Sequence, residues 1–311
     1  TVSAQVGAAT SWAPAGHVVA SGQGLLPAGV PGEPSRPAEA VGGRRVDPDR
    51  FDPVTGRLVR LGATALLGPR LDVWRAPTDN DRGEHGPSVA PEWYRLGLDR
   101  LQHRVVDLGP DGDRFVVRTR VAPAATDIGL LATYRWSEVD DDALDLELEV
   151  TPDGEWTVPL PRLGLLMELP GGLEDVTWFG GGPGEAYADS RQAARVSRYS
   201  SSIDALQTPY VYPQENGNRI DVRWAEVVDG SGAGVRVEGA PTFDLSVRRW
   251  TSADLDAARH PYELRRRDRV FVNVDAGQNG LGTASCGPGV LPAYVLLPAP
   301  TTFSIRLRPV R

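Results

Sequence analysis

The acidic segment Asp79-Asn80-Asp81-Arg82-Gly83 has residue types that could bind a cation. An EF-hand loop does not fit, because the glycine comes one residue early and no bidentate glutamate follows at the required place. Asp and Asn also favour turns, because their side chains bond to the nearby backbone. We therefore interpret the segment as a structural turn. The polar residues 83–90 beyond it are predicted to form a mobile loop of the kind that acts as a lid.

Glu185 and Glu215 are candidates for acid–base chemistry that uses paired carboxylates. Retaining cleavage of a glycosidic bond needs two carboxylates about 5–5.5 Å apart, and spacing along the chain does not bring these two together. Glu215-Asn216-Gly217 is typical of the turn of a strand pair. The favoured interpretation of both glutamates is structural.

A nucleophile is also hard to support. Cys286, the single cysteine, has no histidine nearby in the sequence to activate it. Ser285 beside it is not in a Gly-x-Ser-x-Gly motif. No two histidines have the spacing of a local metal site; they are His17, His85, His103 and His260. We expect Cys286 to be a buried or lining residue on a tight loop.

Phosphate chemistry is disfavoured as well. The glycine-rich run 180–184 is interrupted by Pro183, and no helix pattern follows it, as a dinucleotide site would need. The sequence contains no lysine, so every one of its 33 Lys and Arg residues is an arginine. A Schiff base and a P-loop lysine are therefore excluded.

Composition limits the class of protein. The 311 residues carry a net charge of −8, which argues against sequence-independent binding to nucleic acid. No apolar run approaches the ~20 residues of a membrane helix, so no membrane partner is expected. One cysteine rules out an intrachain disulfide and fits a cytoplasmic location.

The elements that must position these residues are mainly strands. Residues 143–150 alternate strictly between apolar and acidic side chains, which predicts a half-buried strand. Further strands are predicted at 17–20, 115–121, 130–136, 163–169, 176–179, 220–228, 234–237, 243–247, 270–274, 294–297 and 302–307. Short helices are predicted only at 91–96 and 251–258, too few for alternating βαβ units. The sequence therefore predicts an all-β protein without a (β/α)₈ barrel.

The chain is predicted to contain three parts. Residues 27–43 have four prolines and no periodicity, which indicates a linker or a surface loop. Residues 1–26 hold one or two strands, too few to bury a core, and are interpreted as the tail of a preceding domain. Residues 44–311 form the main domain.

Four motifs, taken together and in order, resemble one family. They are Val73-Trp74-Arg75-Ala76-Pro77-Thr78-Asp79-Asn80-Asp81-Arg82-Gly83, the Gly-rich segment 178–189, Thr208-Pro209-Tyr210-Val211-Tyr212-Pro213-Gln214-Glu215-Asn216-Gly217, and 280–288. They are similar to the signatures of the C-terminal domain of glycoside hydrolase family 2 β-galactosidases. Residues 10–17 resemble the end of the immunoglobulin-like domain that precedes it.

The resemblance implies a large antiparallel β-supersandwich similar to galactose mutarotase. It also implies retaining hydrolysis of terminal β-D-galactosides by two glutamates in an upstream barrel. This chain has no such barrel, so no catalytic residue is assigned to it. The magnesium and sodium sites of the family belong mainly to that barrel, and we expect no cofactor here. The galactoside would be shared with the upstream catalytic domain, and the whole enzyme is expected to be a homo-oligomer.

The resemblance also implies two contributions to the active site. Cys286, with Ser285 beside it, occupies the position of a family tryptophan that contacts the aglycone. Asp79, Asn80, Asp81, Gly83 and Glu84 belong to the mobile active-site loop, with Gly83 as its hinge. Because a cysteine offers no stacking face, we expect a wider and less lactose-selective aglycone subsite.

Two alternatives remain open. A stand-alone carbohydrate-binding module would bind galactose without an upstream domain. An aldose epimerase would need a histidine and a carboxylate that converge in a β cleft, and no histidine lies inside the matched motifs, so the epimerase ranks last.

Overall fold

The computed structural model describes residues 1–24, 44–83, 88–140, 143–284 and 287–311. The chain divides into two compact units, Thr1–Ser35 and Arg36–Arg311. The first unit contains an antiparallel hairpin of β1 (Val2–Gln5) and β2 (Val18–Gly22). The predicted linker 27–43 lies outside the described residues. The assignment of residues 1–26 to a preceding domain stays a prediction.

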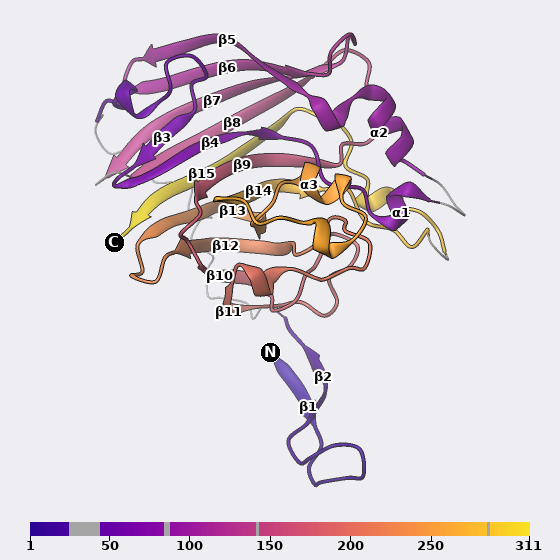
Figure 1. Ribbon diagram of the computed structural model, residues 1–311. Coiled ribbons are helices and arrows are strands. Elements are labelled where there is room, and N and C mark those ends of the chain that lie inside the picture. Colours follow the sequence, from indigo (N-terminus) through magenta and orange to yellow (C-terminus); the bar gives the residue numbers. More distant parts are fainter. Residues whose placement is uncertain (25–43, 84–87, 141–142, 285–286) are drawn as a thin grey trace. The chain divides into compact units, whose positions relative to one another are not determined.

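Within its described residues, the second unit forms a thirteen-stranded antiparallel sheet (Figure 1). The main path runs β3-β4-β9-β14-β13-β15-β8-β7-β6-β5, while β12 pairs with β13 and leads to β10 and β11. The strands are β3 (Leu58–Leu61), β4 (Thr64–Asp72), β5 (Gln102–Asp111), β6 (Arg114–Ala122), β7 (Gly129–Asp140), β8 (Ala143–Asp153), β9 (Arg162–Pro170), β10 (Asp175–Gly182), β11 (Arg195–Ser202), β12 (Arg219–Val228), β13 (Gly234–Arg248), β14 (Arg269–Gln278) and β15 (Thr301–Val310). The predicted all-β supersandwich is confirmed.

The sheet divides at β13. The first half of this strand, from Gly234 to Gly239, pairs with β15, and its second half, from Asp244 to Arg248, pairs with β14. A strand that changes partners along its length turns a sheet onto itself, so that two layers share one core. The predicted strands 234–237 and 243–247 are therefore parts of one long strand.

The alternation in β8 sets its register. Leu144, Leu146 and Leu148 are buried, while Glu147 between two of them is exposed. Leu146 lies opposite Trp136 of β7 and Ile305 of β15, and both of these are buried too. Because side chains alternate between the faces of a strand, one face of three neighbouring strands enters the core.

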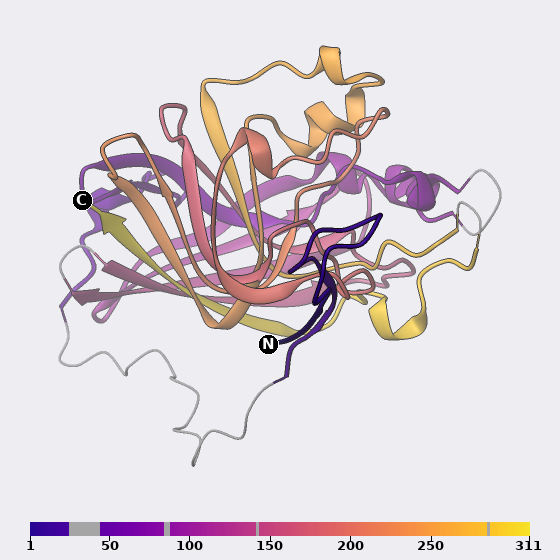
Figure 2. The same ribbon diagram turned by 90° about the horizontal axis from the view of Figure 1, so that it is seen from below.

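The helices are short. They are α1 (Asp79–Arg82), α2 (Ala90–Leu96), α3 (Ser252–Ala257) and the 3-10 turns η1 (Pro48–Arg50), η2 (Leu98–Arg100), η3 (Asp204–Leu206), η4 (Pro261–Glu263) and η5 (Pro292–Tyr294). In the second unit, α1, α2 and the described chain at 280–284 and 287–300 gather at one end of the sheet, opposite the C-terminal residue (Figures 1 and 2). No helix in the described part of the chain has the length and apolar character needed to cross a bilayer.

Some local predictions were confirmed and others were wrong. The predicted helices 91–96 and 251–258 match α2 and α3, and Thr251 caps α3 through a capping box with Asp254. The predicted strand 294–297 is wrong. This segment begins at the last residue of η5, and Leu296 bonds to the side chain of Asn279 and to the backbone of Leu160 rather than to a strand.

Candidate active-site rim

Four segments that are far apart in the sequence meet at the end of the sheet that carries α1. The Asp79 N–H donates to Gln214 Oε1 at 3.0 Å, and Asn80 Nδ2 donates to the carbonyl of Gly282 at 2.7 Å. The N–H groups of Leu281 and Gly282 donate to the carboxylate of Asp189 at 2.9 and 2.7 Å. We call these four interlocked segments, 73–83, 180–189, 208–217 and 279–284, the rim.

The acidic segment 79–83 is a helical turn with caps at both ends. The Thr78 side chain accepts from the N–H of Asp81, and the Asp81 carboxylate accepts from the N–H of Thr78 at 2.8 Å. Gly83 ends the helix in the left-handed region with φ 54°, where a residue without Cβ is favoured. The predicted turn is thus corrected to the one-turn helix α1. Motion of the following loop stays a prediction.

Arg75 fastens α1 to the last rim segment. Its side chain is fully buried, and Nη2 lies 2.9 and 3.0 Å from the two carboxylate oxygens of Asp81. Nη1 donates to the carbonyl of Asn279 at 2.6 Å, and Nη2 also reaches that of Gly280 at 3.4 Å. A buried guanidinium needs such partners, because an unpaired charge in the core costs several kcal/mol. The sequence interpretation did not identify this anchor.

Arg82 has its partners outside its own turn. Its guanidinium lies 4.6 Å from the centre of the Tyr212 ring, and Nη2 lies 3.4 Å from the carboxylate of Asp256 in α3. Tyr94 of α2 donates its hydroxyl to the same carboxylate at 2.5 Å. Burial and this carboxylate raise the pKa of Tyr94. Arg82 therefore connects α1 to α3 and to the third rim segment, and it shares the Asp256 carboxylate with Tyr94 of α2.

Both candidate glutamates are occupied in structural contacts. Glu215 is buried and pairs with Arg248, and its Oε1 lies 3.4 Å from Nη2 of Arg162. Glu185 accepts from the hydroxyl of Tyr210 at 2.5 Å and from the N–H of Gly217 at 2.7 Å. Neither carboxylate is arranged as a free nucleophile or acid, which supports the structural interpretation made from the sequence.

A charged cluster lies beneath the rim. Nε of Arg162 is 3.2 Å from the Asp275 carboxylate, and its Nη1 is 3.7 Å from that of Asp72. With Glu215 and Arg248, the cluster has two guanidinium groups and three carboxyl groups. Burial, with the nearby carboxylates, raises the pKa of Asp275 to about 8. A protonated Asp275 leaves two charges of each sign at neutral pH, so the buried cluster is balanced.

The remaining predicted site residues lie outside the described residues: Glu84, Ser285 and Cys286. Their described neighbours nevertheless share one cavity of about 130 Å³, which Asn80 and Asp81 line from α1. Leu281 and Ala284 line it from the last rim segment. The chain around the predicted aglycone residues therefore approaches the chain around the predicted loop.

The large antiparallel sheet with interlocked loops at one end places this protein in the class of all-β supersandwich domains. Its sequence matches the family model described as the beta galactosidase small chain over residues 49–307. The chain belongs to the β-galactosidase small-chain family.

Individual relatives agree with this family. The chain is 35% identical to a β-galactosidase of Arthrobacter sp. (strain B7), over 99% of this chain and 33% of that protein. It is 31% identical to one of Priestia megaterium, over 91% of this chain and 28% of that protein. It thus spans about a third of the length of the curated relatives it matches. Among solved structures, a galactose mutarotase-like protein from Lactobacillus casei ATCC 334 is 12% identical, with coverage of 65% and 72% and a TM-score of 0.37.

Proposed function

We propose that this chain is the C-terminal domain of a retaining family 2 β-galactosidase, and that it supplies the rim and a mobile loop to an active site completed upstream. The observation that carries the proposal is the interlocking of the four motif segments at one end of the sheet. Their carboxylates hold the segments together and leave no pair free for hydrolysis among the described residues. The catalytic glutamates would then lie in a barrel domain outside this chain.

Within this proposal, the rim has two parts that meet the substrate. Cys286 and Ser285 contact the aglycone side, and Asp79, Asn80, Asp81, Gly83 and Glu84 form the base and start of the loop. The galactoside is shared with the upstream domain, and the whole enzyme is a homo-oligomer that keeps magnesium and sodium in its barrel. A cytoplasmic location belongs to the same proposal.

The isolated chain should not hydrolyse a β-galactoside. We expect no turnover of a chromogenic galactoside above the buffer rate, because neither a nucleophile nor an acid is supplied by the rim. The measurement is release of the chromophore, with a complete relative as the positive control. Sustained turnover by this chain alone would refute the proposed division of roles.

Replacing Cys286 with tryptophan in the complete enzyme should lower the KM for lactose. An indole gives the glucose aglycone an apolar face worth about 1 kcal/mol, or roughly fivefold in KM. Cys286→Ser is the matched control, because it changes the chemistry of the side chain without adding an aromatic ring that could stack on the sugar. An unchanged KM for lactose in Cys286→Trp would place this residue away from the aglycone.

The two alternatives have separate tests. A self-contained carbohydrate-binding module should give saturable heat with galactose in isothermal titration, whereas a half-site should give little. An epimerase should speed the change in optical rotation of α-galactose. His103 and Asp72 do line one cavity, but Asp72 accepts from Trp74 N–H and Asn273 Nδ2, at 3.3 and 2.8 Å. We therefore favour the β-galactosidase domain over an epimerase.

A further inference from the structure

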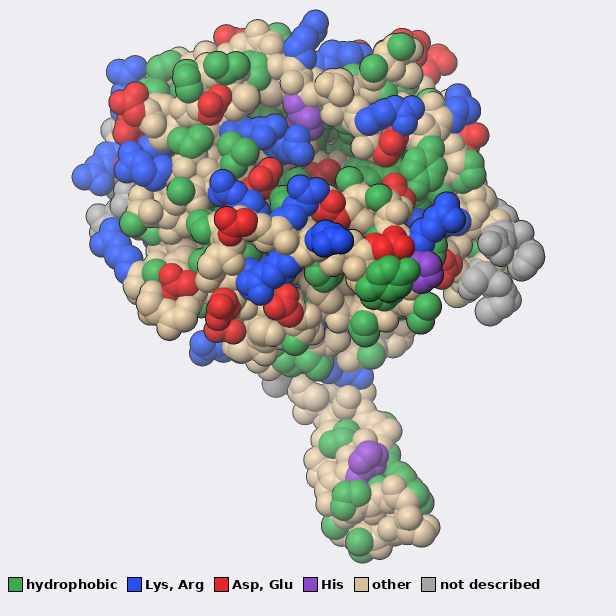
Figure 3. Space-filling model, in the orientation of Figure 1, with side chains coloured by type: hydrophobic (Ala, Val, Ile, Leu, Met, Phe, Trp, Pro, Cys, Tyr) green, Lys and Arg blue, Asp and Glu red, His purple; other side chains and the backbone are tan. Residues whose placement is uncertain are grey.

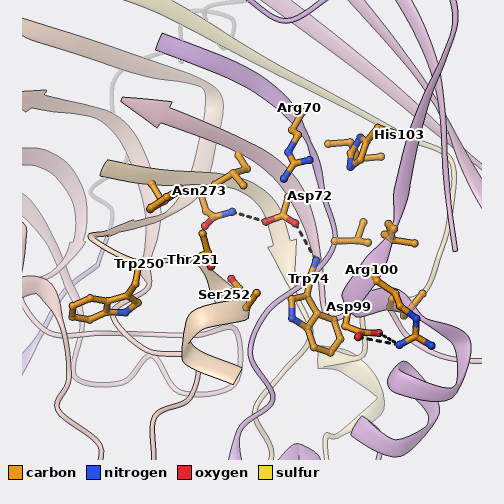
Figure 4. A pocket seen from close by; sticks show the side chains of 17 residues that line it. Arg70, Asp72, Trp74, Asp99, Arg100, His103, Trp250, Thr251, Ser252 and Asn273 are labelled. Atoms are coloured by element: carbon orange, nitrogen blue, oxygen red, sulfur yellow. Dashed lines mark hydrogen bonds and ion pairs between the residues drawn. The ribbon is translucent and has the colours of Figure 1, made fainter. Parts of the chain in front are cut away.

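A second cavity, which adjoins the start of the first rim segment at Val73 and Trp74, lies against strands β4, β5, β9 and β14 and the start of α3. It has a volume of about 220 Å³, and the labelled side chains of Figure 4 surround it. Arg70 and Asp72 come from β4, His103 from β5 and Asn273 from β14, while Trp250 comes from the segment before α3. In Figure 3, arginine side chains border a recess in this face of the second unit.

The acidic groups of this cavity are already neutralised. Asp72 accepts from two donors, Trp74 N–H and Asn273 Nδ2, and lies 3.7 Å from the buried Arg162. Asp99 pairs with Arg100, with 3.0 Å between Oδ1 and Nη1. Their charges therefore contribute little to the potential within the cavity.

Arg70 carries the positive charge in this cavity that no carboxylate neutralises by an ion pair among the described residues. Within the described part of the chain it has no ion pair, and Figure 4 shows its guanidinium beside the cavity without a dashed line to any other group. A small adjoining cavity of about 50 Å³ is lined by both Arg70 and His103 and adds Arg57. Arg57 also has no ion pair among the described residues; Glu168 and Asp52 act on its pKa only through their charges. Two guanidinium groups without an ion pair among the described residues thus line the small cavity, and Arg70 also lines the larger one.

The titration of nearby groups agrees with this excess of positive charge. Burial, followed by Arg70 and Arg57, lowers the pKa of His103 to about 4. Burial and the charge of Arg70 lower the pKa of Arg57 as well. The chain as a whole has a net charge of −8, so this positive region is a local exception. Such a region attracts anions by direct charge pairing and by guanidinium geometry.

We infer that this cavity binds the oxyanion of a small molecule, a carboxylate or a phosphate, with Arg70 as its principal contact and with Arg57 adding positive charge from the adjoining small cavity. The cavity volume limits the ligand to a compact molecule. Trp74 and Asn273 lie where they can contact the uncharged part of such a ligand. This inference does not depend on the proposed β-galactosidase role, because the two proposed anion-binding residues, Arg70 and Arg57, lie outside the rim.

The test is isothermal titration of the 311-residue chain at low ionic strength with three probes. Galacturonate carries a carboxylate, inorganic phosphate tests the other anion, and galactose is the uncharged counterpart of galacturonate. We expect saturable binding of at least one anion and weaker binding of galactose. Arg70→Gln should weaken the anion about tenfold or more, since a charged hydrogen bond is worth about 1.5–3 kcal/mol. Arg60→Gln, an exposed arginine on β3, is the matched control and should change nothing.

A second readout reports the cavity directly. A bound anion should raise the pKa of His103 from about 4 towards its ordinary value, because it offsets Arg70 and Arg57. The change is followed by NMR titration, with His103→Gln identifying the signal and Arg57→Gln as a second weakening variant. Absence of saturation by both anions, equal binding of galactose, or unchanged affinity in Arg70→Gln would each overturn the inference. Hydrolysis assays of the complete enzyme test the rim independently.

Discussion

Replacing Arg75 with methionine should lower the free energy of unfolding by about 3–5 kcal/mol, because it leaves the carboxylate of Asp81 buried and unpaired. Arg75 and Asp81 have side-chain exposures of 0% and 1%. The substitution also removes the donors of the carbonyls of Asn279 and Gly280. The measurement is urea-induced unfolding of the isolated chain.

A double variant separates the charge from the packing. Arg75→Met with Asp81→Asn removes both charges, so we expect it to regain a large part of the loss. Arg118→Met is the control, because its pair with Asp107 is at the surface and is worth at most about 1 kcal/mol. If Arg75→Met were as mild as Arg118→Met, Arg75 could not be the anchor of the rim.

The same variant has a functional consequence under the proposed function. Arg75 holds α1 to the segment that leads to Cys286, so its loss should separate the two parts of the rim. In the complete enzyme we expect a higher KM for lactose and a smaller effect on kcat, because the catalytic glutamates lie elsewhere. A fall in kcat with an unchanged KM would argue that the rim acts on chemistry rather than on binding.

Much of the fold could be predicted from local patterns. Strand β8 was predicted because its buried and exposed residues alternate, and α3 because Thr251 and Asp254 form a capping box within four residues. Strand β11 (Arg195–Ser202) was missed, since it is an edge strand with no fully buried side chain and hence no apolar alternation. Strand β4 was missed because it contains Gly68-Pro69, which the register shift between Leu67 and Arg70 accommodates.

The site was predictable only in part. The motif residues could be located in the sequence. The capping box of α1 follows from the residue types of Thr78 and Asp81 and from their spacing of three residues. Their mutual contacts could not be predicted, because Arg75 and Asn279 are 204 residues apart. A buried arginine also has no local signature that separates it from a surface arginine. One usable signal was missed: Asn273 and Asp275 interrupt the apolar run that starts at Val270, which marks buried polar groups with a specific environment.

Replacing Glu215 with glutamine should be comparably costly, about 3–5 kcal/mol near pH 5, because it leaves Arg162 and Arg248 with too few negative charges. Glu226→Gln is the matched control. Glu226 pairs with Arg236 at 2.7 Å but is 26% exposed, so its loss should cost less than about 1 kcal/mol. Unfolding in urea at several pH values measures both variants.

The pH dependence of the stability cost shows whether Asp275 becomes ionised when the charge of Glu215 is removed. Asp275 has a folded pKa of about 8, above the ordinary value of 3.8, so its contribution to stability is complete at low pH and is lost as the pH rises towards 8. In Glu215→Gln, the two arginines should draw Asp275 into its ionised form and lower its pKa. The variant should therefore lose less stability than the wild type between pH 5 and pH 8, and the cost of the substitution should shrink over that range. A stability cost of the substitution that stays constant with pH would mean that removing the charge of Glu215 does not change the ionisation of Asp275. The cluster would then be held by fixed ion pairs rather than by a shared balance of charge.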